Sequence, residues 1–392
     1  MDYIKWRGDL PFDRDPLNSV DAVIFASIAY MDFGGVIPEH GEITFREASE
    51  KFFELHSDDE LLNNKIIFYN RFAPPLLRQV AQSARFSNLR LSHFVDHTDI
   101  GTMTQFAAYT IRISDNEVFI AFRGTDDSIV GWKEDFYLSL CTVSSEDEAV
   151  QYLIDGQGGK TDRIYLGGHS KGGHLSVYSA FCVDPEIQNR IVGIFDLDGP
   201  GFNEEQKASE QFRKISSRIT RIIPENSIIG RLLEDTAAPI IVSSTEKGVM
   251  QHDPMSWQLE GKEFISLPCN SVASDVFDDT LSTWIRDMDL SERKQFTDDL
   301  FSVLEASGVT NISQMSGIGL LSVKKMLDRL HMVKKESQGK IRILIKMFID
   351  NWGEILVDLA KTGSEESKLD VTLPFRKLIE AKKGNTTEEA KT

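Results

Sequence analysis

The sequence predicts an α/β protein whose mostly parallel sheet is flanked by helices. Two observations carry this prediction. Between residues 106 and 243, short apolar runs rich in β-branched residues alternate with segments of helical spacing, which is typical of parallel sheets covered by helices. After about residue 280 the strand-like runs stop, and only helical spacing remains. The chain has 392 residues, enough for one large α/β domain with additions.

The first hundred residues are predicted to be mainly helical. Residues 20–30 form an apolar run with Asp21 near its start, and residues 45–55 and 75–86 have apolar side chains at helical spacing. Polar loops separate these runs. We therefore expect residues 1–100 to form an N-terminal helical segment that packs on the α/β core.

The α/β core is expected over residues 101–280. It begins with a hairpin, because β-rich runs at 106–113 and 117–122 flank the turn-forming Ser114-Asp-Asn116. Helices and further strands then alternate along the chain. The expected helices are 147–154, 172–182 and 204–214, and the expected strands are 163–166, 191–197, 219–223 and 239–243.

The C-terminal region is expected to be a helical extension over residues 281–382, in a position to cap the core. Residues 283–304 and 320–361 have apolar side chains at helical spacing. The last ten residues, 383–392, are polar and are expected to form a disordered tail.

Composition and charge exclude several classes of partner. Asp and Glu number 61 against 43 Lys and Arg, so the formal charge is −18. Nucleic-acid binding and broad adhesion to anionic membranes both need a basic surface, so neither is expected. Three cysteines, without metal-ligand spacing, indicate a reducing compartment. Because no apolar stretch reaches roughly 18 residues, we expect a cytoplasmic protein without stable membrane insertion.

The most informative motif follows the strand expected at 163–166. Gly168-His-Ser-Lys-Gly172 matches G-x-S-x-G, and an apolar helical pattern begins directly after it. In a nucleophile elbow the strand turns sharply into a helix, so the serine adopts a strained backbone and only small neighbours avoid collision. In this context the motif predicts the α/β-hydrolase fold, with Ser170 as the nucleophile.

A serine nucleophile needs a base that takes its proton and an acid that orients the base. In this fold both follow the serine in the chain, the acid before the histidine. His252 lies in a loop directly after the last predicted strand and is the expected base. His331, in a basic helical segment of the C-terminal region, is the alternative.

The acid is expected among the carboxylates that follow the predicted strands. Asp198 ends the strand 191–197, where Gly-Pro-Gly breaks the strand and lets the carboxylate face the site. Glu225 follows the next strand, which is the more usual place for the acid of this fold. Asp235 and Glu234 are further options. We expect Asp198 to be the acid, with Glu225 as the alternative.

Two backbone donors are expected to form an oxyanion hole. One is the N–H of Lys171, directly after the nucleophile. The other lies at the end of an earlier strand, in Phe122-Arg-Gly-Thr125, where Thr125 offers its N–H and its hydroxyl.

These motifs resemble those of known hydrolases. Phe122-Arg-Gly-Thr125, followed by Gly131-Trp132 and Asp135, is similar to the oxyanion strand of the class 3 lipases. Over roughly residues 1–265, the chain more closely resembles the Mbeg-like family of bacterial α/β-hydrolases. The shared motifs are Trp6-Arg-Gly-Asp9, Phe122-Arg-Gly-Thr125, Gly168-His-Ser-Lys-Gly-Gly173, Asp198-Gly-Pro-Gly201 and Gln251-His-Asp-Pro-Met-Ser-Trp257.

The resemblance implies a serine-hydrolase site at Ser170, Asp198 and His252. In the Mbeg-like family the position of Glu225 is commonly an amide, which favours Asp198 as the acid. Lys171 departs from the lipases, which have an apolar residue directly after the serine.

Together these residues predict a serine hydrolase that cleaves a small-molecule carboxylic ester, lipid esters included, through an acyl-enzyme. No metal or organic cofactor is expected. Within the enzymes, the alternatives are a peptidase or an acyltransferase that uses the same triad. Outside the enzymes, the alternative is a hydrolase-fold protein that binds a ligand without turnover.

Overall fold

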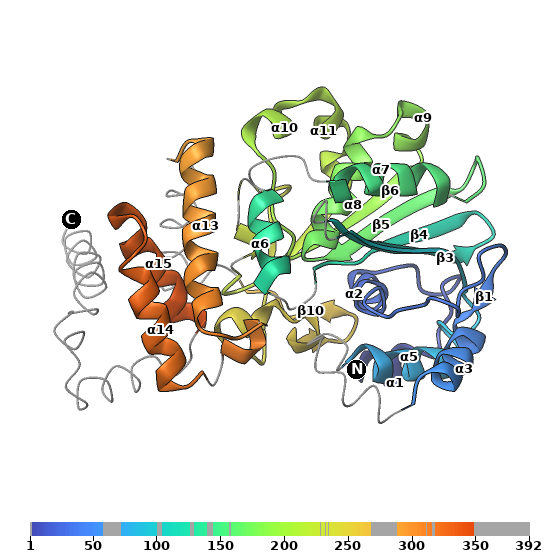
Figure 1. Ribbon diagram of the computed structural model, residues 1–392. Helices are drawn as coiled ribbons and strands as arrows, with labels where there is room; N and C mark the ends of the chain where they lie inside the picture. The colour runs from blue at the N-terminus through green and yellow to red at the C-terminus, as the bar shows by residue number, and fades with distance from the viewer. Residues whose placement is uncertain are drawn as a thin grey trace, which may run out of the picture.

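A sheet of eight strands forms the centre of the structure (Figure 1). The computed structural model describes residues 2–57, 72–99, 104–125, 129–138, 144–156, 158–227, 229–231, 233, 235–267, 288–310, 312–315 and 318–348. Neighbouring strands of the sheet follow one another in chain order. They are β1 (Ile43–Thr44), β2 (Arg90–Asp99), β3 (Thr104–Ser114), β4 (Glu117–Phe122), β5 (Arg163–His169), β6 (Ile191–Leu197), β7 (Ile219–Pro224) and β8 (Ile240–Val242).

The sheet is antiparallel from β1 to β4 and parallel from β4 to β8. β3 and β4 form the expected hairpin. In the parallel part, Phe122 pairs with Gly168 and His169 pairs with Leu197, so β4, β5 and β6 end at the same edge of the sheet. This mostly parallel sheet, flanked by helices, confirms the predicted α/β-hydrolase fold.

β1 and β2 lie in a region that the sequence pattern predicts to be mainly helical. β2 has a register shift between Ser92 and Val95, and His93 between them has a φ of 52°. The shift breaks the period-2 alternation on which the prediction of a strand depends. Residues 1–100 therefore contribute strands to the central sheet as well as helices.

Helices cover both faces of the sheet because alternate side chains of each strand point to opposite sides. In β4, Phe119 and Ala121 pack with the N-terminal helices, whereas Val118 and Ile120 pack against α7 and α8. Figure 1 shows α2 below the sheet and α7 and α8 above it. The first layer comprises α1 (Asp2–Arg7), α2 (Ser19–Ile28), α3 (Phe45–Leu55) and α5 (Ala73–Gln82), and the second comprises α7 (Ser144–Gly156), α8 (Lys171–Cys182), α9 (Pro185–Gln188), α10 (Glu204–Ala208) and α11 (Glu210–Ile215).

Besides the apolar clusters on the two faces of the sheet, a third cluster joins the C-terminal helices to α6 (Ile129–Leu138), which follows β4. Ile129, Trp132 and Phe136 of α6 are buried in it. Figure 1 shows the C-terminal helices beside α6, at the end of the molecule away from β1. They are α13 (Leu290–Ala306), α14 (Leu320–Leu330) and α15 (Lys335–Phe348).

The C-terminal helices differ from their predicted bounds. α13 begins at Leu290, and the start of the helix expected over 283–304 lies outside the described residues. The helix expected over 320–361 is broken after Leu330 and resumes at Lys335. Residues 349–361 and the tail 383–392 lie outside the described residues.

Short turns and a small hairpin complete the connections around the sheet. The 3-10 turn η4 carries His252, and η5 follows it directly. All these short elements connect helices and strands. They are η2 (Ser216–Arg218), η3 (Ile229–Arg231), η4 (Gly248–His252), η5 (Pro254–Ser256), β9 (Leu259–Glu260), β10 (Glu263–Phe264) and η6 (Ile312–Met315).

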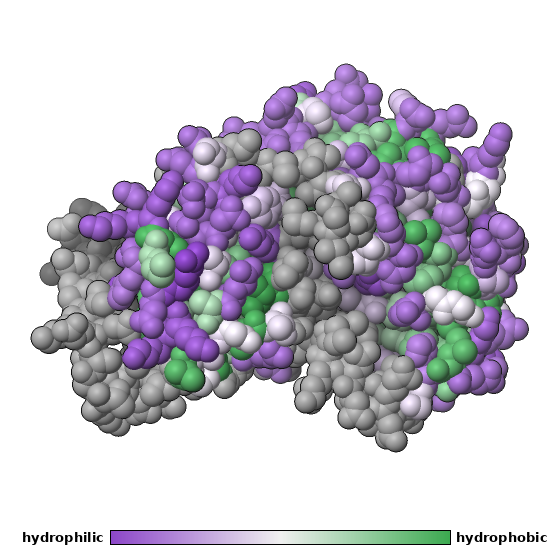
Figure 2. All heavy atoms as spheres, viewed as in Figure 1, coloured by the Kyte–Doolittle hydropathy of each residue, from purple (hydrophilic) through white to green (hydrophobic). Residues whose placement is uncertain are grey.

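Hydrophilic side chains cover most of the described surface seen in Figure 2, and apolar side chains stand in small groups. Such small groups are ordinary on folded proteins. Among the helices within the described ranges, none is long and apolar enough to cross a membrane.

The N-terminal segment is fixed by a buried ion pair between Arg85 and Asp21. Both side chains are fully buried, and Nη2 of Arg85 lies 2.5 Å from Oδ2 of Asp21. Arg85 also donates to the carbonyl oxygens of Leu10 and Asp15, each at 2.9 Å, and the hydroxyl of Tyr3 donates to Asp21 at 2.9 Å. These bonds join α1, α2 and the residues after α5.

Replacing Arg85 by methionine is expected to lower the free energy of unfolding by about 3–5 kcal/mol, because the carboxylate of Asp21 is then left buried without its cation. Urea unfolding measures the change. Arg14→Met is the matched control, because Arg14 is 76% exposed and its loss is expected to cost about 0.5 kcal/mol or less. Equal unfolding midpoints for the two variants would contradict this role of the ion pair.

Candidate active site

Ser170 lies in the turn between β5 and α8, where the sequence predicts the elbow. Its φ is 58° and its ψ is −130°, a conformation that non-glycine residues rarely adopt. The N–H of Ser170 donates to the carbonyl of Leu197 at 2.9 Å, and its own carbonyl accepts from Gly173 at 2.8 Å. The end of β6 and the first turn of α8 therefore hold the strained residue from both sides.

Gly172 shows how tightly the elbow packs against the end of β4. A Cβ atom at this position would overlap the carbonyl oxygen of Phe122 and lie 2.9 Å from its carbonyl carbon. The backbone of α8 thus approaches β4 to a distance that only glycine permits. The second glycine of G-x-S-x-G is explained by this approach.

His252 and Asp198 form a buried hydrogen-bonded pair beside the elbow. Nδ1 of His252 lies 2.6 Å from Oδ2 of Asp198, and the two residues are 6% and 0% exposed. Asp198 follows β6 with a φ of 56°, and its N–H donates to the carbonyl of Ile222 at 2.8 Å. A carboxylate only accepts hydrogen bonds, so Nδ1 of His252 is the donor, and in the neutral ring Nε2 carries the lone pair.

The other oxygen of Asp198 is held by Ser227, which the sequence pattern did not reveal. The hydroxyl of Ser227 donates to Oδ1 of Asp198. Ser227 Oγ in turn accepts from the N–H of Gly230 at 2.9 Å. Both carboxylate oxygens therefore have partners, which fixes the orientation of the group that faces His252.

The rings of Trp132 and His169 also contact His252. Trp132 of α6 meets its imidazole edge-on, with ring centroids 5.6 Å apart, and the ring of His169 lies 4.4 Å away. His169 precedes Ser170, so this contact places His252 beside the elbow. The sequence offered one signal for Trp132, its resemblance to the tryptophan of the lipase oxyanion region, and assigned it no role.

Thr125 and Lys171 both lie near Ser170: Lys171 follows it directly, and a Cβ atom at Gly124, next to Thr125, would lie 3.1 Å from Cβ of Ser170. Thr125 follows β4, Lys171 opens α8, and both are buried. The first N–H groups of a helix have no partner within the helix, so the N–H of Lys171 belongs to a set suited to an anion. The side chain of Lys171 turns away to β3, where its Nζ donates to the carbonyl of Gln105 at 2.8 Å.

The other candidate residues have different surroundings. Glu225 is half-buried, and its N–H donates to the carbonyl of Val242 at 3.2 Å. Asp235 lies 3.2 Å from Nε of Arg221. His331 is exposed at the end of α14, and Glu234 lies outside the described residues. Of the candidate carboxylates, Asp198 is the one that the structure pairs with His252.

The geometry suits nucleophilic chemistry on a carbonyl carbon. It combines a strained serine, a buried imidazole oriented by a carboxylate and a helix N-terminus at one end of the sheet. Within the described residues, no group of three or more His, Cys, Asp or Glu side chains is arranged to hold a metal ion.

Comparisons with known proteins cover more than half of the chain. A family model described as Mbeg1-like matches residues 80–302, more than half of the chain. Among solved structures, the chain is similar to M37 lipase, with 15% identity, a TM-score of 0.34 and coverage of 55% of this chain and 70% of that chain. It is also similar to a mutant form of MDLA from Penicillium cyclopium, with 13% identity, a TM-score of 0.35 and coverage of 65% and 87%. Among curated proteins, none matches.

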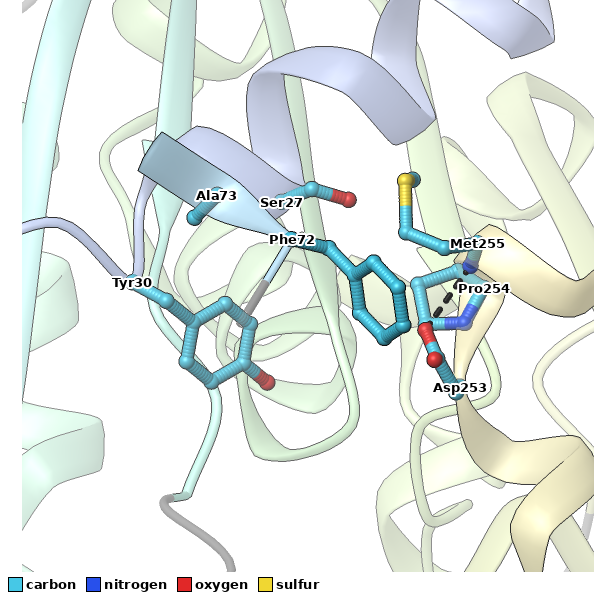
Figure 3. A pocket seen from close by; sticks show the side chains of 7 residues that line it. All are labelled: Ser27, Tyr30, Phe72, Ala73, Asp253, Pro254 and Met255. Carbon is cyan, nitrogen blue, oxygen red and sulfur yellow. Dashed lines mark hydrogen bonds between the residues drawn. The ribbon is translucent and has the colours of Figure 1, made fainter. Parts of the chain in front are cut away.

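Asp253, directly after His252, lines a small cavity between α2, the start of α5 and η5 (Figure 3). The cavity measures about 10 Å³, room for about one water molecule. Oδ1 of Asp253 accepts from the N–H of Met255 at 2.9 Å, and burial raises the pKa of this carboxyl to about 6. The folded protein therefore binds a proton on Asp253 more readily than the unfolded chain does.

Asp253→Asn is expected to raise the free energy of unfolding at about pH 8 by up to about 3 kcal/mol, since burial of a charged carboxylate is then avoided. The wild type regains this stability as the pH falls from above 6 to about 4, so the advantage of the variant shrinks over that range. Urea unfolding across the pH range tests this. Asp13→Asn, at a site 73% exposed, is the matched control, and an equal pH dependence of the two variants would contradict the expectation.

Proposed function

This chain belongs to the Mbeg1-like family, and we propose that it is a serine hydrolase that cleaves carboxylic esters of lipid or short-acyl type. The single observation that carries the proposal is the buried Asp198–His252 pair beside the strained Ser170 of the elbow. A structural turn needs neither a serine in a rare conformation nor a buried imidazole with an oriented lone pair.

In the proposed first step, Oγ of Ser170 attacks the ester carbonyl carbon while Nε2 of His252 takes the hydroxyl proton. Asp198 holds the ring and stabilises the imidazolium, and it stays ionised itself. The bond of Ser227 to the second oxygen of Asp198 supports this role, because it leaves the carboxylate one orientation.

The negative charge on the carbonyl oxygen is proposed to be stabilised by the N–H groups of Lys171 and Thr125. Donors fixed in place before the reaction act strongly where water is excluded, and both residues are buried. Collapse of the intermediate expels the alcohol, which receives the proton from His252. Water then attacks the acyl-enzyme by the same route and releases the acid and Ser170.

The apolar surroundings of His252 support an ester with an apolar acyl part. Trp132 lies on His252 and belongs to the same apolar cluster as Ile229 and the C-terminal helices. The hydroxyl of Tyr137 donates to Asp298 of α13 at 2.7 Å, and Lys133 lies 3.3 Å from that carboxylate. We propose that α6 and the C-terminal helices together cap the site and exclude water from it.

Ser170→Ala is expected to lower p-nitrophenyl ester hydrolysis by about 10³-fold or more and to abolish labelling by a fluorophosphonate probe, because the nucleophile is removed. Ser176→Ala is the matched control: Ser176 is also buried on α8, and its hydroxyl donates to the carbonyl of Gly173 at 2.6 Å. Labelling without ester hydrolysis by the wild type would favour a peptidase or acyltransferase. Labelling of Ser170→Ala at the wild-type rate would overturn the assignment.

Asp198→Asn is expected to lower kcat by about 10³–10⁴-fold, because an amide no longer stabilises the imidazolium or fixes its tautomer. Glu225→Gln is expected to change kcat by less than about threefold. Steady-state kinetics on one ester compares the two variants directly. The opposite ranking would assign the acid to Glu225.

A further inference from the structure

A buried chain of hydrogen bonds links the end of α2 to the loop that carries His252. The hydroxyl of Tyr30 lies 2.9 Å from Nδ1 of His169, and Nε2 of His169 lies 2.7 Å from the carbonyl oxygen of His252. Tyr30 and His169 are 3% and 0% exposed. The chain is separate from the Asp198 bond, which reaches the ring of His252 and not its backbone.

The direction of each bond follows from the chemistry of the groups. A carbonyl oxygen only accepts, so Nε2 of His169 carries a hydrogen. Burial lowers the pKa of His169 well below its usual value, with the neighbouring His252 as a further cause, and the ring is neutral. A neutral imidazole has a single N–H, so Nδ1 accepts and the hydroxyl of Tyr30 donates to it.

The same pair touches the loop that carries Thr125. A Cβ atom at Gly124 would overlap both the hydroxyl of Tyr30 and the carbonyl oxygen of His169, and it would lie 3.1 Å from Cβ of Ser170. Tyr30 and His169 therefore pack against the elbow and against the loop of Gly124 and Thr125, which we call the oxyanion loop. The hydrogen bond of His169 connects the pair to the loop that carries His252.

We infer that His169, oriented by Tyr30, is a positioning residue that sets the backbone of His252 against the elbow and the oxyanion loop. The inference rests on the proposed function. Asp198 holds the ring of His252 at Nδ1. The position of Nε2 of His252 relative to Ser170 is fixed only when the backbone of His252 is held as well. His252 ends a 3-10 turn outside the sheet, so its backbone is set by loop and side-chain contacts, among them the bond from His169.

The neutral state of His169 matters for the same reaction. The rings of His169 and His252 are 4.4 Å apart, and His252 becomes a cation during turnover. A second cation at this distance would oppose that step. A histidine held as its Nε2–H tautomer supplies a donor to the carbonyl without adding charge. The carbonyl of His252 selects that tautomer, and the hydroxyl of Tyr30 supports it by donating to Nδ1.

The test compares Tyr30→Phe, His169→Leu and His169→Gln with the wild type in ester kinetics. Tyr30→Phe is expected to lower kcat about tenfold and His169→Leu about 100-fold, with KM changed less than about twofold, because the base is misplaced while the pocket is intact. His169→Gln keeps a neutral donor near the place of Nε2 and is expected to stay within about fivefold of the wild-type kcat. In ¹⁵N-histidine NMR spectra, the wild type is expected to show His169 as the Nε2–H tautomer, and Tyr30→Phe a shifted signal of the unprotonated Nδ1, because its hydrogen-bond donor is lost.

Tyr109→Phe is the matched control for stability. Tyr109 is fully buried, and its hydroxyl donates to the carbonyl of Phe25 in the same helix α2, at 2.9 Å. Loss of the Tyr109 hydroxyl is expected to lower the melting temperature about as much as Tyr30→Phe does and to leave kcat unchanged. If His169→Leu does not fold, Tyr30→Phe and His169→Gln decide the question.

The outcomes separate this inference from the proposed function. When the wild type is labelled by the fluorophosphonate and Ser170→Ala is not, the hydrolase assignment stands. Wild-type kcat in Tyr30→Phe, or failure of His169→Gln to exceed His169→Leu, then overturns the positioning role alone. A wild type that is neither labelled nor active overturns both.

Discussion

The strained backbone at Ser170 is the constraint on which the rest of the structure depends. A residue with a φ of 58° costs about 1–3 kcal/mol and persists only where its surroundings determine it fully. Here those surroundings are the ends of β4 and β6 and the first turn of α8, which bond to the elbow or press against it. The aligned ends of β4, β5 and β6 offset the cost of this strain, so the packing of the sheet stabilises the conformation that Ser170 needs in the candidate site.

Buried charges near this edge of the sheet are kept apart by backbone geometry. Asp196 and Asp198 are two residues apart and would face the same side in a regular strand. The positive φ of Asp198 ends the regular strand and turns its carboxylate to His252 and Ser227, whereas Asp196 pairs with Arg221 and accepts from Thr236 at 2.7 Å. A single left-handed residue therefore separates an ion pair within the core from the carboxylate of the site.

The C-terminal helices share an apolar cluster with α6, which lies beside the candidate site. Their apolar cluster includes Trp132, which lies on His252, and the N–H of Ile129 donates to the carbonyl of Thr310 at 2.9 Å. α6 is thus held between the core and the extension.

The sequence by itself determined the α/β architecture, the hairpin and the elbow, because strand alternation, turn residues and glycine spacing are local patterns. It also gave Ser170, His252 and Asp198 as the expected catalytic residues, with Glu225 as the alternative acid. Only the tertiary structure decided that Asp198 meets His252, that β2 joins the sheet and that Ser227, Tyr30 and His169 surround the site. Tyr30 and His169 are 139 residues apart, and a hydrogen bond over such a separation leaves no periodic signal in the chain. The hydrogen bond forms only once folding has brought Tyr30 and His169 together.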